Sequence, residues 1–320
     1  MHLLVLGALN TPVDQTESPV PVTESAETAH LESGPLSTSA ELDGLPSPVD
    51  RAALDRAGAQ RFLGKSAGLS IALRRQGGDQ AVWAAALDCL GYSRNRRAFR
   101  RVAARLPWSL LSEGLAACAD ALPMLMWAGG FGPKPRYLRN PGPAGHKPGG
   151  PVPDWVLGGR PDNSPERRLV AAAGLAERWS VDGPLKSIIE LVRTVDDPKE
   201  LIRAFVVGAE GHPARGTRAL IGDGRAREIV VNAVLTLAHG WSLMADRWDV
   251  TEKALQLYDD HPKLPSNAVT REMVSVLKSQ GSDIKVRGAK EQQGLLLMYR
   301  AMTAGPLYAS PPENSETQHV

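Results

Sequence analysis

The chain has little cysteine and few aromatic residues, and both shortages narrow its class. Two cysteines in 320 residues, Cys89 and Cys118, exclude a disulfide framework and a cysteine-rich zinc module. Aromatic residues make up only 5%, so the 42% apolar content that can form a core rests largely on Ala and Leu. No apolar run reaches the roughly 18–20 residues that cross a bilayer. The apolar Met1–Leu9 stretch is short for a signal peptide and has no charged start, so we expect a cytoplasmic protein without a membrane segment.

Residues 1–50 lack Lys and Arg altogether, and this absence reveals an uneven charge distribution. They hold eight of the 35 acidic residues, so residues 51–320 carry 37 basic and 27 acidic residues, a net charge of +10. A folded body of this charge attracts polyanions or acidic proteins, and the acidic segment is able to compete for the same surface. Charge that merely keeps the protein soluble is an equally open interpretation.

Composition divides the chain into an N-terminal segment, a helical domain and a tail. Residues 11–48 are rich in Thr, Ser, Pro and Glu, so we expect residues 1–50 to be mostly disordered, with short strands at Leu3–Leu6 and Val20–Val22 only if a sheet receives them. The helical domain covers 51–305: a first half over 51–128, a Gly/Pro-rich loop over 129–163 and a second half over 164–305. Residues 306–320 form a polar tail. About ten helices and no convincing strand after residue 50 predict an all-α fold, an irregular helical array.

Caps and breaks place these helices. The glycines at 58, 64 and 68 weaken the first helix enough for it to break in two, Pro123 interrupts a later helix, and Gly129–Pro161 is predicted to hold no regular element. The expected start residues are Asp50, Asp79, Ser93, Ser164, Asp197, Asp249 and Asn267. The expected helical stretches include 51–75, 80–90, 94–106, 110–127, 165–179, 224–245 and 288–303.

Catalytic and metal-binding signatures are missing. The seven histidines form no His-x3-His pair and none accompanies a cysteine pair, and no Ser lies in a G-x-S-x-G elbow. Cys89 and Cys118 fit small buried residues better than nucleophiles. We therefore assign no catalytic residue, metal or cofactor, identify no small-molecule substrate, and lean against an enzyme.

A basic helix is the clearest local signal. Six arginines lie within twelve residues that include no acid, and Phe99, Val102 and Leu106 mark the side of the helix expected to be buried. Like charges at this spacing repel, and a polyanion would relieve the repulsion. The open alternative is a solvated face that is partly paired with acids elsewhere in the fold. The candidate residues are Arg94, Arg96, Arg97, Arg100, Arg101 and Arg105, with Arg160 and Arg168 extending the patch.

Three weaker signals lie in the second half of the chain. The rigid Gly159–Pro165 turn puts Arg160 and Arg168 on either side of Asn163, where they form either a ligand site or a helix entry that pins the loop. Gly222–Arg225 is a weak phosphate-binding candidate at a helix start, and a plain glycine turn is the alternative. Asn232 interrupts the most apolar helix and needs polar partners, for which Gln292 and Gln293 are available.

Four of these stretches together resemble a bacterial family, domain of unknown function 2851. They are LGYSRNRRAF (90–99), GRPDNSPERR (159–168), IGDGRAREIVVNAV (221–234) and AKEQQGLLLMYR (289–300). Their order and spacing are similar to the helical C-terminal half of that family over about residues 51–305. The positions that fall on the family's recurrent residues are Gly91, Tyr92, Asn95, Phe99, Arg160, Pro161, Asn163, Pro165, Arg168, Gly222, Asn232, Gln292 and Gln293.

The chain departs from this family at both ends. Longer members look as if they carry an N-terminal half similar to a restriction-nuclease core, and a cysteine cluster after the last helix; this sequence has neither. The resemblance therefore implies either a naturally shortened member or a sequence whose start was placed too late, and the activity of the longer members does not carry over to it. The function we expect is a non-catalytic helical module that binds nucleic acid through its basic helix or accompanies a nuclease-like domain. The alternative is a protein-interaction or scaffold module that docks an acidic partner.

Overall fold

The computed structural model describes residues 49–139, 149–157, 164–208 and 219–303, all of which belong to one compact unit, Leu36–Val320. The fold is all-α, as the sequence predicts, and the described residues include no strand, only two isolated bridges between extended residues. The predicted disordered segment up to residue 48, with its two short strands, and the predicted tail from 306 lie outside the described residues. No helix in the described ranges is long and apolar enough to cross a membrane.

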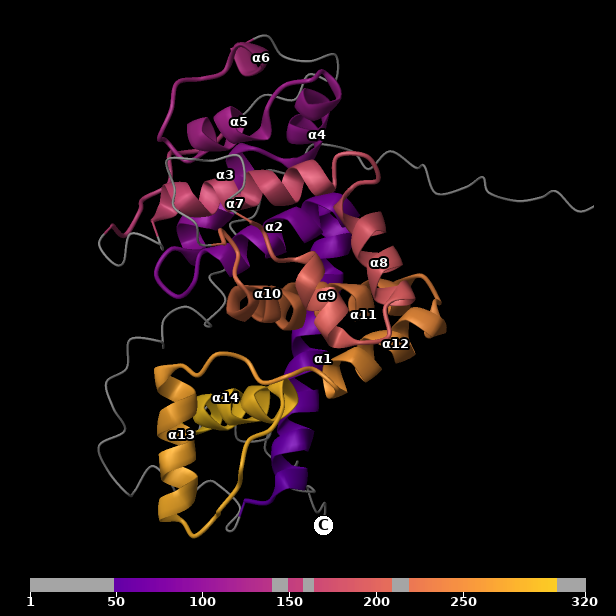
Figure 1. Ribbon diagram of the computed structural model, residues 1–320, viewed down its shortest axis with the longest axis vertical. Coiled ribbons are helices and arrows are strands. Elements are labelled where there is room, and N and C mark those ends of the chain that lie inside the picture. Colours follow the sequence, from indigo (N-terminus) through magenta and orange to yellow (C-terminus); the bar gives the residue numbers. More distant parts are fainter. Residues whose placement is uncertain (1–48, 140–148, 158–163, 209–218, 304–320) are drawn as a thin grey trace, which may run out of the picture. The chain divides into compact units, whose positions relative to one another are not determined.

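The helices are more numerous and shorter than the sequence suggested (Figure 1). The first half contains α1 (Arg51–Gln76), α2 (Gly78–Leu90), α3 (Arg96–Arg105), α4 (Trp108–Ala116), α5 (Ala121–Ala128) and the single turn α6 (Arg136–Arg139). The second half begins with α7 (Pro165–Arg178), α8 (Pro184–Thr194), α9 (Pro198–Ala204), α10 (Asp223–Ile229) and the π-helical turn η4 (Val230–Val234). It continues through α11 (Leu235–Met244), α12 (Trp248–Asp259), α13 (Ala268–Ser279) and α14 (Ala289–Thr303).

The long helix α1 begins where its cap predicts but does not break at its glycines. The Asp50 carboxylate accepts a hydrogen bond from the Ala53 N–H at 2.7 Å, which satisfies one of the free donors of the first turn. Gly58 faces α14 so closely that a Cβ there would collide with the carbonyl oxygen of Lys290, whereas nothing lies within 4 Å of a Cβ at Gly64. The predicted break is therefore wrong, because packing against α14 offsets the low helix propensity at Gly58.

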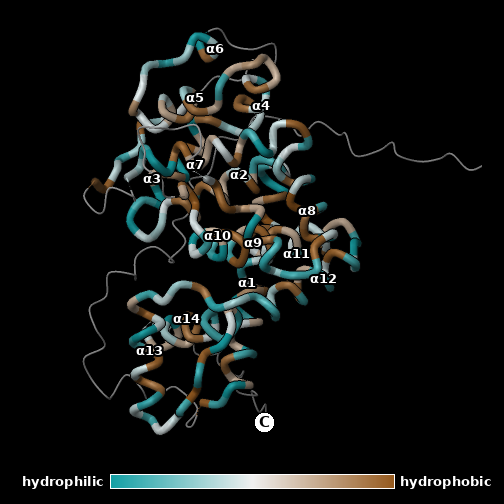
Figure 2. The backbone as a smooth tube through the Cα atoms, viewed as in Figure 1, coloured by the Kyte–Doolittle hydropathy of each residue, from teal (hydrophilic) through white to brown (hydrophobic). Residues whose placement is uncertain are grey.

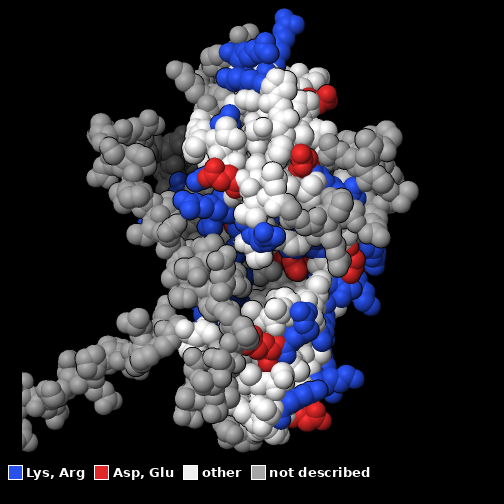
Figure 3. Space-filling model, turned by 90° about the vertical axis from the view of Figure 1, so that its left-hand side faces the viewer, with Lys and Arg blue, Asp and Glu red and all other residues white. Residues whose placement is uncertain are grey.

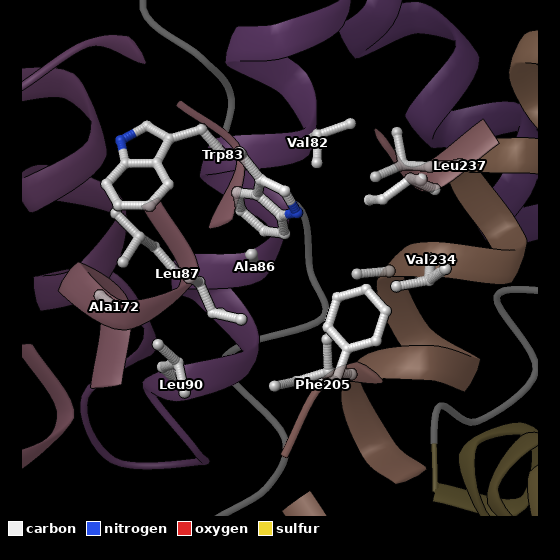
Figure 4. Packing of buried hydrophobic residues seen from close by; sticks show 14 of the residues in the cluster. Val82, Trp83, Ala86, Leu87, Leu90, Ala172, Phe205, Val234 and Leu237 are labelled. Atoms are coloured by element: carbon white, nitrogen blue, oxygen red, sulfur yellow. The ribbon is translucent and has the colours of Figure 1, made fainter. Parts of the chain in front are cut away.

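The main core is built around α2, which packs against α1, α3, α4, α7, α8, α10 and η4. Trp83 and Leu87 are fully buried there, and Ala172 of α7 and Val234 of η4 approach them from the second half of the chain (Figure 4). The Trp83 indole N–H donates to the Leu106 carbonyl at 3.1 Å, so its polar atom is satisfied in the apolar surroundings. Both predicted halves thus contribute to one core.

A second, smaller core lies where the first turns of α1 meet α13 and α14. It contains seven buried residues, among them Leu54, Met273 and Leu295. Along α13 and α14, hydrophobic and hydrophilic residues alternate (Figure 2), as expected of helices with one buried side. Asn267 caps α13 in a full capping box with Thr270, which confirms the predicted start of this helix. Helix α1 therefore contributes to both cores.

Several predicted helix boundaries are wrong, in one case because a tertiary contact uses the predicted cap and in two cases for local reasons. Asp79 does not cap α2; its carboxylate accepts from the Leu185 N–H at 2.9 Å and caps α8 instead. Helix α3 begins at Arg96 rather than after Ser93, since residues 91–94 form a turn. Pro123 lies in the first turn of α5, where its missing N–H costs no hydrogen bond, so the interruption falls at 117–120.

The predicted loop over Gly129–Pro161 is only partly irregular, since α6 forms within it. Its described segment 149–157 lies against α3. The Asn95 amide exchanges two hydrogen bonds with the backbone of Val156, and the Trp155 ring packs edge-on against Phe99 at 5.1 Å. The Trp155 indole also donates to the Gly129 carbonyl at 2.7 Å. This loop segment is thereby anchored beside the basic helix.

Candidate functional site

The six arginines predicted to bind a polyanion lie on the outer side of α3 and the turn before it, and we call them the arginine face (Arg94, Arg96, Arg97, Arg100, Arg101, Arg105). The prediction of the opposite side is confirmed, because Phe99, Val102 and Leu106 are fully buried. Arg94, Arg97 and Arg100 are exposed, and the other three are half-buried. On the side of the molecule drawn in Figure 3, Lys and Arg atoms gather at several places with fewer acidic atoms among them.

Among the described residues, Asp88 and Asp154 are carboxylates that contact the arginine face. Asp88 of α2 accepts from Arg96 and lies 3.4 Å from the guanidinium of Arg100. Asp154 of the 149–157 segment pairs with Arg101. Arg105 donates to the Gly150 carbonyl at 2.9 Å and its guanidinium lies 4.4 Å from the Trp127 ring centre. Several members of the arginine face therefore make contacts within the fold, and Arg94, Arg97 and Arg100 are the members exposed to solvent.

The turn between α2 and α3 fixes an aromatic ring beside this face. A Cβ at Gly91 would lie 2.5 Å from the Cα of Arg96, so only glycine lets the chain turn this tightly. Tyr92 then takes a left-handed backbone conformation with φ of 55°, which is uncommon for a large side chain. Such strain persists only where the surroundings enforce it, and here the enforcing contacts are two cations on the ring.

Arg168 and Arg225 lie on the Tyr92 ring, at 4.0 and 3.1 Å from its centre. Each arginine belongs to the first turn of its helix, α7 and α10 respectively. Arg168 is buried and donates to the carbonyls of Leu90 and Gly91, and Arg225 donates to the carbonyl of Cys89 at 3.3 Å. The end of α2 thus receives two guanidinium groups from the second half of the chain.

A polar chain continues from Arg225 to α1. Arg225 pairs with Glu228. Burial raises the pKa of the Glu228 carboxyl above its usual value, against the opposing effect of Arg225. The Asn232 amide donates to the Glu228 carbonyl at 2.9 Å and accepts from the Lys65 ammonium at 2.5 Å. Asn232 lies in the π-helical turn η4, a widened turn of a kind often found at functional sites. This polar chain therefore links α1 to the Tyr92 ring, through Lys65, Asn232, Glu228 and Arg225.

The expected partners of Asn232 are wrong, because Gln292 and Gln293 have other roles. Gln292 bonds both the N–H and the carbonyl of Leu264, at 2.5 and 3.0 Å, and so holds the loop before α13. Gln293 accepts from the Arg61 guanidinium at 2.9 Å. The remaining described positions have backbone roles: Pro165 is the first residue of α7, and Gly222 precedes α10. Arg160, Pro161 and Asn163 lie outside the described residues.

Cys89 is close to these cations but is not activated by them. Burial, and then the charge of Asp88, raise the pKa of its thiol to about 12, against the opposite effect of Arg96, Lys65 and Arg225. A thiol with this pKa stays protonated at neutral pH and is a poor nucleophile. Within the described ranges, no group of three or more His, Cys, Asp or Glu side chains is arranged to hold a metal ion.

A shallow hollow of about 430 Å³ lies elsewhere, beside α7 and the bridge between Val207 and Ile221. Val170, Ala173 and Gly174 line its floor, and Glu177 and Arg178 also border it. Arg178 is already bonded to the carbonyls of Ala204 and Val206. None of the predicted site residues lines this hollow.

Tyr92 and Arg168 could be identified from the sequence, whereas Lys65 and Glu228, which are linked to the ring through Asn232 and Arg225, could not. Lys65 lies in a long helix with several exposed charges, and Glu228 follows two arginines, so neither stands out by spacing. Arg225 was singled out only as part of a weak phosphate motif. Three of the four stretches that carry the family resemblance thus meet around the Tyr92 ring. No protein-family model, curated protein or solved structure matches the chain, so the geometry of this region has to suggest what it does.

Proposed function

We propose that this chain is a non-catalytic helical module that binds a polyanion, with nucleic acid as the first candidate, through the arginine face of α3. The carrying observation is the exposure of Arg94, Arg97 and Arg100 on one side of a segment whose other side is fully buried. The segment itself contains no acid, and residues 51–320 carry a net charge of +10. Guanidinium groups contact phosphates in two-pronged fashion, and contacts of this kind supply most non-specific affinity for nucleic acid.

The pairing of Arg96, Arg100 and Arg101 with acids limits this proposal to part of the face. Arg101 and Arg105 hold the 149–157 segment against α3 through Asp154 and Gly150, so they serve the fold first. Arg94, Arg97 and Arg100 are the exposed members of the face, so they are the ones expected to reach phosphates, and Arg100 would exchange its contact with Asp88 for a phosphate. These three arginines lie within seven residues of one another in the sequence.

The family resemblance supports a place beside a nuclease-like partner. Stretches 90–99, 159–168 and 221–234 are far apart in the sequence, yet Arg168 and Arg225 both lie on the Tyr92 ring. This contact gives a physical reason for the same residue types to recur together. We propose on this basis that the chain is a relative of the domain of unknown function 2851 family.

Fluorescence anisotropy of labelled duplex DNA, single-stranded DNA and RNA with the full chain, over a salt series, tests the proposal. We expect binding that weakens steeply with salt, since each neutralised duplex phosphate contributes about −0.9 to the slope of log K against log salt. The triple variant Arg94→Glu, Arg97→Glu, Arg100→Glu should lose at least tenfold in affinity, roughly what loss of a few phosphate contacts implies, and should flatten the slope by about three.

The matched control reverses three exposed charges elsewhere, Lys199→Glu, Arg203→Glu and Lys278→Glu, on α9 and α13. Both variants change the net charge equally, so only a local role of the arginine face separates them. Absence of binding at low salt, or equal loss in both variants, would overturn the proposal. The remaining alternative is an acidic protein as the partner. Displacement of the labelled probe by polyglutamate, at the concentrations at which unlabelled DNA displaces it, would favour an acidic protein.

A further inference from the structure

Tyr92, Arg168 and Arg225 concentrate positive charge in a nearly water-free place. The two guanidinium carbons lie 4.0 and 3.1 Å from one ring centre, so the two cations are close neighbours. Arg168 is 8% exposed, and the side chain of Arg225 is 13% exposed. Bulk water screens the repulsion between these two cations only weakly, because little water reaches them.

The two arginines are neutralised unequally. Arg225 has a carboxylate partner, Glu228, whereas Arg168 has only the ring and the carbonyls of Leu90 and Gly91 as partners within the described residues. Asp88, a carboxylate near the end of α2, is already shared by Arg96 and Arg100. A buried cation without a counter-charge is costly, and burial together with the neighbouring Arg225 lowers the pKa of Arg168 to about 10 against the opposing effect of Tyr92.

Hydrogen-bond donors are also left over. The Nε–H groups of Arg168 and Arg225 are buried and have no acceptor in the described part of the chain. Buried donors without partners call for an explanation, and an ion bound beside them is one. Two unused N–H donors and one unmatched positive charge together fit an oxyanion, since guanidinium groups bind phosphate through paired N–H bonds.

We propose that Tyr92, Arg168 and Arg225 form a binding site for a single phosphate group, either inorganic phosphate or the phosphate of a small monoester, and we call it the phosphate site. The burial of its arginines suits a small anion rather than a duplex, so this proposal is independent of nucleic-acid binding at the arginine face. The Tyr92 ring keeps both guanidinium groups in place when the anion is absent, because cations bind favourably over an aromatic face. The strained backbone at Tyr92 is the conformational cost of holding that ring there.

Isothermal titration calorimetry of the full chain with inorganic phosphate at pH 7 tests the site, with chloride at matched ionic strength as the reference. We expect saturable binding of phosphate with a Kd below about 1 mM and a rise in Tm that equal ionic strength of chloride does not produce. A parallel titration with phenyl phosphate separates the two sources. Tighter binding of the ester points to an esterified ligand, and binding of phosphate alone points to the free ion.

Two variants and one control make the result specific. The double variant Arg225→Gln, Glu228→Gln removes a cation together with its carboxylate, and Arg168→Lys keeps the charge but removes the two-pronged donor. Each should weaken phosphate binding at least tenfold, whereas Arg203→Gln on the exposed side of α9 should leave it unchanged. The triple glutamate variant of the arginine face should still bind phosphate, so failure of one proposal is distinguishable from failure of the other. Lack of a phosphate-specific heat and Tm shift, or binding unchanged in both site variants, would overturn the phosphate site.

Discussion

We expect the buried side chain of His261 to make the stability of this protein depend on pH. It is 1% exposed, its Nδ1 lies 2.8 Å from the Pro262 carbonyl oxygen, and its Nε2 has no partner in the described part of the chain. Burial lowers the pKa of His261 to about 4 against the opposing effect of the Pro262 bond. A proton on Nε2 would therefore be a buried charge with no acceptor.

The sign of the pH dependence follows from this shift. Because the folded pKa is about 4 and the unfolded value 6.5, the unfolded chain takes up the proton first as the pH falls. We expect the stability associated with neutral His261 to be fully present above pH 6.5. It should be lost as the pH falls towards 4, a decrease in the free energy of unfolding on the order of 3 kcal/mol. His239 shifts in the same direction through burial. Urea unfolding at pH 7, 6 and 5 measures the loss.

The variant His261→Asn isolates the effect, because asparagine keeps a donor for the Pro262 carbonyl and does not titrate. Its free energy of unfolding should fall less steeply between pH 7 and 5 than that of the parent chain. Parallel loss in the two proteins would assign the acid sensitivity to other groups.

Among the helices, the crossing of α1 and α14 depends on glycine at the point of contact. A Cβ at Gly58 would collide with the Lys290 carbonyl, and one at Gly294 would collide with the Leu54 carbonyl. These atoms are backbone, so they yield only if a whole helix moves. Gly58→Ala should therefore destabilise the protein by about 2 kcal/mol or more, as overpacking does, despite the better helix propensity of alanine.

Gly64→Ala is the matched control on the same helix. Nothing lies within 4 Å of its Cβ position, so the substitution should stabilise the protein by about 0.5–1 kcal/mol. Thermal or urea unfolding of both variants gives the comparison. Equal effects of the two substitutions would show that propensity, rather than helix contact, decides the role of Gly58.

Helix boundaries could be predicted from the sequence where the cap is local. Ser164 and Asn267 bond N–H groups three residues ahead, so the starts of α7 and α13 follow from the residues themselves. Asp79 looks equally local, but its carboxylate caps α8, 106 residues away. The wide turn η4 and the left-handed Tyr92 are decided by neighbours as well. Sequence pattern therefore fails where tertiary contacts claim a side chain.

The candidate site, like the helix boundaries, could be predicted from the sequence only where it depends on local pattern. The buried side of α3 follows from the spacing of Phe99, Val102 and Leu106, and the charge of the arginine face follows from composition. The contact of Arg168 and Arg225 with one ring does not, because nothing in either stretch indicates that α7 and α10 begin beside the same turn. The link from Asn232 to Lys65 likewise depends on how η4 packs.

At the scale of the whole molecule, the two cores differ in size. The small core holds seven buried residues, while the main core draws on most of the other helices. A region with few buried apolar contacts opens at lower free energy than a large core. We expect backbone amides of α13 to exchange with solvent faster than those of α2 and α11, measured by hydrogen exchange and mass spectrometry.

The variant Met273→Ala sharpens this test, because Met273 is fully buried in the small core. Removing its side chain should speed exchange in α13 and α14 and in the first turns of α1, and leave α2 and α11 unchanged. Uniform acceleration over all these helices would mean that the two cores unfold as one cooperative unit.

The contact between α1 and α14 also determines how late the chain can finish folding during its synthesis. Arg61 and Gln293, which are bonded to each other, are 232 positions apart, and Tyr258 bonds the Gly58 carbonyl across 200. During synthesis the early part of α1 emerges long before its partners exist. Contacts this distant in sequence form late and slowly. The inner side of α1 around Leu54 therefore waits uncovered until translation reaches α14, and that interval is when this protein most needs protection from aggregation.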